Sequence, residues 1–174
     1  MKNALIIGGL CVVLLALGAA FYFHATIPSE STSATASTES PTKAEVKFKV
    51  LGAGEHANTV VERKNYAIYD LAEYNEMWKR AHNDDGTKAP YVDFNTSYVI
   101  GVFAGRQPTA GYSIAVTRVT ETGDARTVAV TIAEPGDGCN VIEEETSPYQ
   151  FVVVPFSESM ALAHTDVRSK KDCR

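Results

Sequence analysis

The chain has 174 residues and a formal net charge of −5, from 21 acidic and 16 basic residues. After an apolar amino-terminal segment, this length leaves room for one globular domain. The negative charge argues against a nucleic-acid-binding protein, and three cysteines are too few for a disulfide scaffold.

The first predicted element is a transmembrane helix over Ala4–Phe23. These 20 residues carry no charge, and at about 1.5 Å of helical rise each they would span about 30 Å, the thickness of a bilayer's hydrocarbon core. Lys2 is the only Lys or Arg before Lys43, so the positive-inside rule places the amino terminus in the cytoplasm. We therefore expect a single-pass protein of the cell membrane that contacts the lipid bilayer through this signal-anchor and has an extracytoplasmic carboxyl-terminal domain.

Two alternatives for this segment stay open. Small residues over 16–20 are compatible with cleavage of a signal peptide, although the apolar run continues past them to aromatic residues. Lipidation of Cys11 is the weaker alternative, because the residues before it match the lipoprotein pattern poorly and the cysteine lies within the apolar run.

The next segment, Thr26–Thr42, consists almost wholly of Ser, Thr, Ala, Glu and Pro. It has too little apolar surface to offset its chain entropy, so we expect a disordered linker. The sequence thus predicts three parts, with the tip and anchor at 1–24, the linker at 25–43 and the extracytoplasmic domain at 44–174.

The domain begins with a strand pattern and one helix. Val46, Phe48 and Val50 alternate with lysines, which predicts a half-buried strand ending in a turn at Gly52–Gly54. A second extended stretch is predicted over about 59–69. Asp70 is a good N-cap for a helix that ends at 83–86. Its predicted buried face consists of Leu71, Tyr74, Trp78 and Ala81.

The pattern after Pro90 is β throughout. Tyr98–Ala104 is almost continuously apolar, which is typical of a strand covered on both faces. A Gly-containing turn at Glu121–Asp124 predicts a hairpin. The remaining predicted strands are Ser113–Val119, Arg126–Ala133, Gln150–Phe156 and a weaker Ala161–Val167. These elements predict an α+β domain, a mostly antiparallel β-sheet with one early helix, preceded by a single transmembrane helix and a disordered linker.

Sequence motifs of catalysis are absent, including the nucleophile elbow, the P-loop, the dinucleotide fingerprint and the zinc-protease motif. The four histidines lie far apart, so no metal site and no cofactor are predicted. His164, Asp166 and Ser159 suggest a catalytic triad, but a polar carboxyl-terminal segment explains them better. The acidic run Glu143–Glu145 is interpreted as a solvated loop.

The most specific local signal is Gly105–Tyr112, with the sequence GRQPTAGY, between two predicted strands. Pro108 fixes φ and Gly111 permits a positive φ, so the loop should be rigid. As a hairpin connection it needs no function; the alternative is a recognition surface. The candidate binding residues are Arg106, Gln107, Pro108, Thr109, Gly111 and Tyr112.

Cys139 and Cys173 both lie in the part expected to be outside the cytoplasm. An oxidising compartment favours a disulfide between them, which would close a loop of about 35 residues and stabilise the fold by roughly 3 to 4 kcal/mol. Two unpaired thiols are the alternative.

Several short segments resemble one known family. They are VDF at Val92–Phe94, VFAG at Val102–Gly105, PTAGY at Pro108–Tyr112, SIAV at 113–116, EPG at Glu134–Gly136 and TSPYQFVVVP at Thr146–Pro155. Over roughly Phe94–Phe156 the chain resembles the carboxyl-terminal domain of the protease complex subunit PrcB, with Ala110 at a position where the family is expected to have Gly. The resemblance implies a small exported domain without recognised catalysis, in a family named for a member that supports assembly or stability of a secreted protease complex.

The sequence therefore predicts a membrane-anchored extracytoplasmic binding module that is not an enzyme. Its expected partner is an envelope or secreted protein, and the family's name suggests a protease complex as that partner. Two alternatives stay open, a small hydrolase whose site is dispersed in the sequence and a structural spacer.

Overall fold

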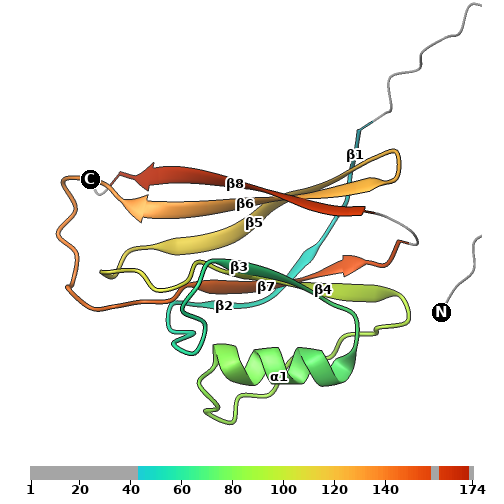
Figure 1. The fold of residues 1–174 in the computed structure, drawn as a ribbon, viewed down its shortest axis with the longest axis horizontal. Helices are drawn as coiled ribbons and strands as arrows, with labels where there is room; N and C mark the ends of the chain where they lie inside the picture. The colour runs from blue at the N-terminus through green and yellow to red at the C-terminus, as the bar shows by residue number, and fades with distance from the viewer. Residues whose placement is uncertain (1–42, 158–160, 173–174) are drawn as a thin grey trace, which may run out of the picture. The chain divides into compact units, whose positions relative to one another are not determined.

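The computed structural model describes residues 43–157 and 161–172, which form eight strands and one helix (Figure 1). The elements are β1 Ala44–Glu45, β2 Lys49–Gly54, β3 Lys64–Ile68, α1 Leu71–Ala81, β4 Ser97–Phe103, β5 Ser113–Thr122, β6 Ala125–Pro135, β7 Tyr149–Pro155 and β8 Ala161–Lys171. The predicted anchor Ala4–Phe23 and the predicted linker as far as residue 42 lie outside the described residues. No helix within the described ranges has the length and apolar character needed to span a membrane.

The strands form two four-stranded sheets instead of the single sheet expected. One sheet has the order β1-β5-β6-β8 and the other the order β2-β7-β4-β3. Every strand pair is antiparallel except β6 with β8, which is parallel. The mostly antiparallel α+β class is therefore confirmed for the domain.

The domain has three layers, with α1 on one face of the β2-β7-β4-β3 sheet and the second sheet on its other face (Figure 1). Residues of β4 alternate between the two interfaces. Val99 and Phe103 belong to the core beneath α1, whereas Ile100 and Val102 belong to the core between the sheets. The prediction that this strand is covered on both faces is confirmed, because each side of the central sheet has its own apolar layer.

The helix begins as the sequence predicts. One side-chain oxygen of Asp70 accepts hydrogen bonds from the backbone N–H groups of Ala72 and Glu73, at 2.8 and 2.9 Å. The predicted burial of Leu71 is wrong, since this first helical residue is 57% exposed. Met77 instead completes the buried face, because it lies three residues after the buried Tyr74.

The turn predicted at Gly52–Gly54 is also wrong, because both glycines lie within β2. A Cβ atom at Gly52 would be 2.6 Å from the ring of Trp78, and one at Gly54 would be 2.7 Å from the ring of Tyr149. The glycines are therefore needed for the close approach of aromatic rings to the strand, and not for a change in chain direction.

Candidate functional site

The loop Gly105–Tyr112 joins β4 to β5, and these strands lie in different sheets. The predicted hairpin connection is therefore wrong. The turn signals of the loop reflect the passage of the chain from one layer to the next. The chain turns sharply in a connection between layers, as it does in a hairpin, so turn-forming residues such as Pro and Gly occur in both kinds of connection.

The first half of the loop is held by backbone hydrogen bonds. Gly105 has φ of +73°, and its Cα packs against the backbone of residues 61–63. The N–H of Arg106 donates to the carbonyl of Val61 at 3.0 Å. The backbone of Gln107 exchanges two hydrogen bonds with that of Thr146, at 2.8 and 3.1 Å. The loop is thus tied to two segments that are distant from it in sequence.

The second half of the loop is held in the same way. The Thr146 hydroxyl donates to the carbonyl of Thr109 at 3.0 Å, and the N–H of Ala110 donates to the carbonyl of Ile142 at 3.0 Å. Gly111 has φ of +90°, which confirms the predicted positive φ. Tyr112 is half-buried, whereas Pro108 is exposed. Arg106 and Pro108 are therefore the predicted residues that the loop presents most fully to solvent.

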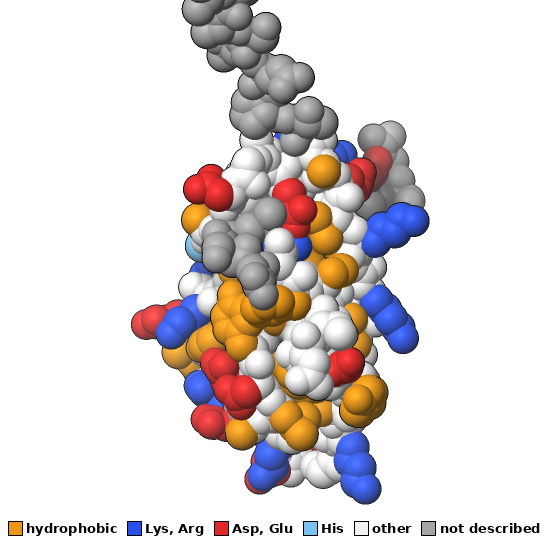
Figure 2. Space-filling model, turned by 90° about the vertical axis from the view of Figure 1, so that its right-hand side faces the viewer, with side chains coloured by type: hydrophobic (Ala, Val, Ile, Leu, Met, Phe, Trp, Pro, Cys, Tyr) orange, Lys and Arg blue, Asp and Glu red, His pale blue; other side chains and the backbone are white. Residues whose placement is uncertain are grey.

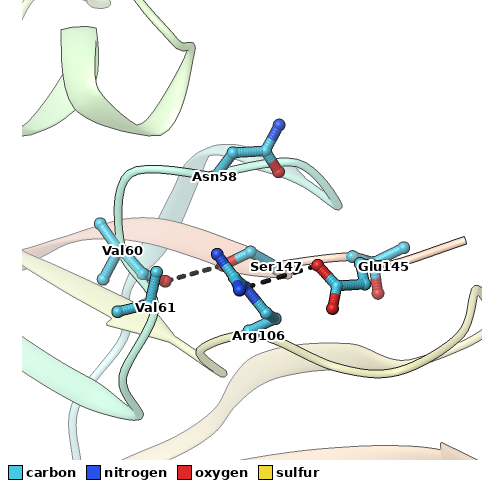
Figure 3. A pocket seen from close by; sticks show the side chains of 7 residues that line it. Asn58, Val60, Val61, Arg106, Glu145 and Ser147 are labelled. Carbon is cyan, nitrogen blue, oxygen red and sulfur yellow. Dashed lines mark hydrogen bonds and ion pairs between the residues drawn. The ribbon is translucent and has the colours of Figure 1, made fainter.

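A pocket of about 200 Å³ lies beside Arg106 (Figure 3). The Arg106 side chain is 58% exposed, and its Nε lies 3.6 Å from Oε2 of Glu145. The buried Ser147 hydroxyl donates to the carbonyl of Val60 at 2.9 Å and closes the base of the loop that precedes β3. The pocket is lined by Asn58, Val60, Val61, Arg106, Glu145, Thr146 and Ser147. It combines the exposed apolar side chain of Val61 with a cation and an anion at its rim.

Most of this lining was missed by the sequence prediction. Asn58, Val60 and Val61 come from the loop before β3, and Glu145 and Ser147 come from the segment before β7. Among the predicted binding residues, Arg106 lines the pocket. The sequence marks the missed residues by no periodicity or spacing, and the exposure of Val61 becomes visible only in the structure.

The residues of the suggested catalytic triad have other partners or lie elsewhere. Asp166 accepts two hydrogen bonds from the Arg63 guanidinium, at 2.6 and 3.0 Å. His164 is exposed in β8, and Ser159 lies outside the described residues. Across 43–157 and 161–172, no group of three or more His, Cys, Asp or Glu side chains is placed to hold a metal ion.

A polar cluster at the end of α1 fastens the helix to the sheet. His82 Nδ1 lies 2.8 Å from the carbonyl oxygen of Trp78, and His82 Nε2 lies 3.1 Å from the hydroxyl of Tyr149. Burial raises the pKa of Tyr149. Because the His82 ring is also stacked on Trp78, these contacts are explained by helix capping and packing.

The predicted disulfide between Cys139 and Cys173 stays a prediction, because Cys173 lies outside the described residues. The Sγ atom of Cys139 lies 3.9 Å from the carbonyl oxygen of Lys171. Lys171 precedes Cys173 by two residues, so Cys139 lies next to the segment that leads to its predicted partner.

Hydrophobic side chains also gather on the end of the domain where β3 and β7 end and α1 begins (Figure 2). Tyr69, Leu71 and Phe156 are 53%, 57% and 47% exposed there, and the Tyr69 ring stacks on Tyr98 with centroids 5.1 Å apart. A patch of this kind is a secondary candidate surface. The Arg106 pocket is the stronger candidate, because it combines an exposed charge with the exposed apolar side chain of Val61.

The fold and the pocket define a small α+β domain in which three chain segments from separate parts of the sequence line one pocket. Residues 98–155 match the family model described as PrcB C-terminal, which confirms the predicted resemblance. The matched segment runs from the second residue of β4 to the end of β7. No curated protein and no solved structure matches the chain.

Proposed function

We propose that the domain is a non-catalytic binding module that recognises a protein through the Arg106 pocket and the loop Gly105–Tyr112. The observation that carries this proposal is an exposed arginine on a loop held by backbone hydrogen bonds at both halves. Arginine is among the residue types that most often dominate binding energies at interfaces. A rigid loop supports this role, because little conformational entropy is lost when it binds.

The chemistry of the pocket favours a partner segment with an acidic residue beside an apolar one. The guanidinium of Arg106 has an exposed ion pair with Glu145, and a carboxylate of the partner would compete for the same donors. An apolar side chain of the partner would contact Val61, which is 52% exposed, at the other wall of the pocket. Both contacts are needed for affinity, since exposed ion pairs alone contribute little.

The partner that the family assignment favours is a protease complex of the envelope or the secreted fraction, whose assembly or stability the domain would support. The basis is the family description and not a feature of the pocket. We further propose that Ala4–Phe23 anchors the chain in the cell membrane with the domain outside the cytoplasm. Alkaline extraction of isolated membranes tests the anchor, which fails as a hypothesis if the full chain is released with the peripheral proteins.

Replacing Arg106 with Ala should weaken capture of the partner by more than about 1 kcal/mol, which is at least about fivefold in affinity. The Tm of the domain should stay nearly unchanged, because surface substitutions of this kind usually alter stability by less than about 0.5 kcal/mol. The measurement is quantitative mass spectrometry of proteins recovered from envelope extracts with tagged wild-type and variant chains.

The matched control for this experiment is Arg118→Ala, which removes an exposed arginine from β5. It should recover the partner at the wild-type level. If all three proteins recover the partner equally, the loop does not take part in binding, and a role as a structural spacer is favoured. Turnover of peptide or ester substrates that persists through purification would contradict the non-catalytic assignment.

A further inference from the structure

The last strand, β8, leaves one whole edge of its sheet without a described neighbour. It pairs with β6 over its full length, from Ala161 opposite Ala125 to Lys171 opposite Pro135. It ends the strand order β1-β5-β6-β8 (Figure 1). All 11 of its residues are exposed. Such an edge presents a row of backbone donors and acceptors that can pair with another strand.

The register of β8 sets which of its side chains lie on each face of the sheet. Asp166 lies opposite Val130 and Arg168 opposite Ile132, and both of these β6 residues are buried between the two sheets. Asp166 and Arg168 are therefore on the inner face, two residues apart and opposite in charge. Val167 lies between them on the outer face.

We propose that β8 pairs with β8 of a second copy of this chain, antiparallel and about a two-fold axis at Val167. In this register Asp166 of each copy lies opposite Arg168 of the other, so two pairs of opposite charge form. Thr165 of each copy lies opposite Ser169 of the other, and the two Val167 side chains lie opposite each other. Opposite charges and β-branched residues in these positions stabilise strand pairs.

Charge selects this register over its neighbours. An axis at Asp166 places the two Asp166 carboxylates opposite each other. An axis at Arg168 places the two Arg168 guanidinium groups opposite each other. Both arrangements are destabilising, because like charges face each other across the strands. An axis at Thr165 places Arg168 opposite Leu162. Among these registers, the Val167 register is the one in which Asp166 and Arg168 each meet a charge of opposite sign.

The two charged side chains are placed for this contact. Asp166 is held by the bidentate bond from Arg63, and its oxygens retain further lone pairs that can accept a second guanidinium. The Arg168 side chain is 68% exposed and has an ion pair with Glu134 of β6. The acid is therefore fixed on the edge, and the base has room to reach across to a second copy.

Cross-linking of the full chain tests the register. Val167→Cys should give a disulfide-linked dimer under mild oxidation, because the two introduced cysteines face each other across the axis. Thr165→Cys is the matched control, since the two copies of residue 165 would lie about 13 Å apart along the strands, beyond the roughly 7 Å limit between Cα atoms for a disulfide. Both variants contain the same native cysteines. Equal dimer yields from the two variants would overturn the proposal.

Charge variants test the association itself, by light scattering of the full chain purified in non-ionic detergent. Arg168→Glu places like charges opposite each other twice, so its dimerisation should be weaker than wild type by about tenfold or more. Arg168→Lys keeps the opposite charges and should dimerise nearly as well as wild type. Circular dichroism establishes that each variant is folded. A wild-type monomer at the highest concentration, or an unchanged mass for Arg168→Glu, would overturn the proposal and leave the β8 edge open to a strand from another protein.

Discussion

Replacing Arg126 with Met should lower the free energy of unfolding by about 3 to 5 kcal/mol, the typical cost of removing one partner of a buried ion pair. Arg126 is 3% exposed, although it is charged. Its guanidinium donates to a carboxylate oxygen of Glu121, whose side chain is 25% exposed. Methionine would fill much of the space but would leave this carboxylate without its cation.

The cost is expected to be large because Arg126 connects the two sheets. It lies in β6, and its Nη1 atom donates to the carbonyl of Pro155 at 2.7 Å and to the hydroxyl of Tyr98 at 3.1 Å, both in the opposite sheet. Burial opposes the charged form of Arg126, but the bonds to Tyr98 and Glu121 outweigh it and raise the pKa of the guanidinium. The arginine therefore stays charged, and its loss leaves acceptors unpaired in both layers.

Urea unfolding followed by circular dichroism measures this effect. Arg118→Met, an exposed position in β5, is the matched control and should change stability by less than about 0.5 kcal/mol. Arg126→Lys should fall between the two, since it keeps the charge but loses the fork that reaches several acceptors at once. A loss for Arg126→Met as small as that of Arg118→Met would show that the network contributes little to stability.

The sequence predicts single elements of the domain well where the signal is local, but it does not predict the second sheet. The apolar run of β4 predicts two covered faces, and Asp70 predicts the start of α1, because these signals depend on residues close together in the chain. The role of Gly52 could not be predicted in this way. Its contact is the ring of Trp78, 26 residues later, and a glycine at a turn has the same local pattern.

Some residues of the candidate site can likewise be predicted from local sequence, and others cannot. The loop Gly105–Tyr112 could be found because its turn residues are contiguous. The apolar side chain of Val61 and the acid at Glu145 could not, because they reach Arg106 through the packing of the strands. Arg126 is a similar case, since its position at the start of an alternating run does not indicate contacts with Tyr98 and Pro155.

Gly105 is the point at which the fold and the candidate site depend on the same backbone. Its φ is +73°, and a Cβ atom there would lie 2.7 Å from the backbone nitrogen of Arg63 and 2.7 Å from the carbonyl carbon of Glu62. Neither contact can be relieved by rotating a side chain. The next residue, Arg106, donates its N–H to Val61 in the same segment, so a shift at Gly105 would displace the arginine as well.

Gly105→Ala should therefore lower the free energy of unfolding by about 2 to 5 kcal/mol, combining the cost of a positive φ with that of the overlap. Gly123→Ala is the matched control, because Gly123 has φ of +59° but nothing within 4 Å of a Cβ atom. It should lose only about 1 to 2 kcal/mol. Urea unfolding gives both values, and the difference between them measures the contact with the backbone of residues 62–63. Equal losses would mean that the loop moves away without cost, and the Arg106 pocket would then lack the rigid support on which the proposed binding face depends.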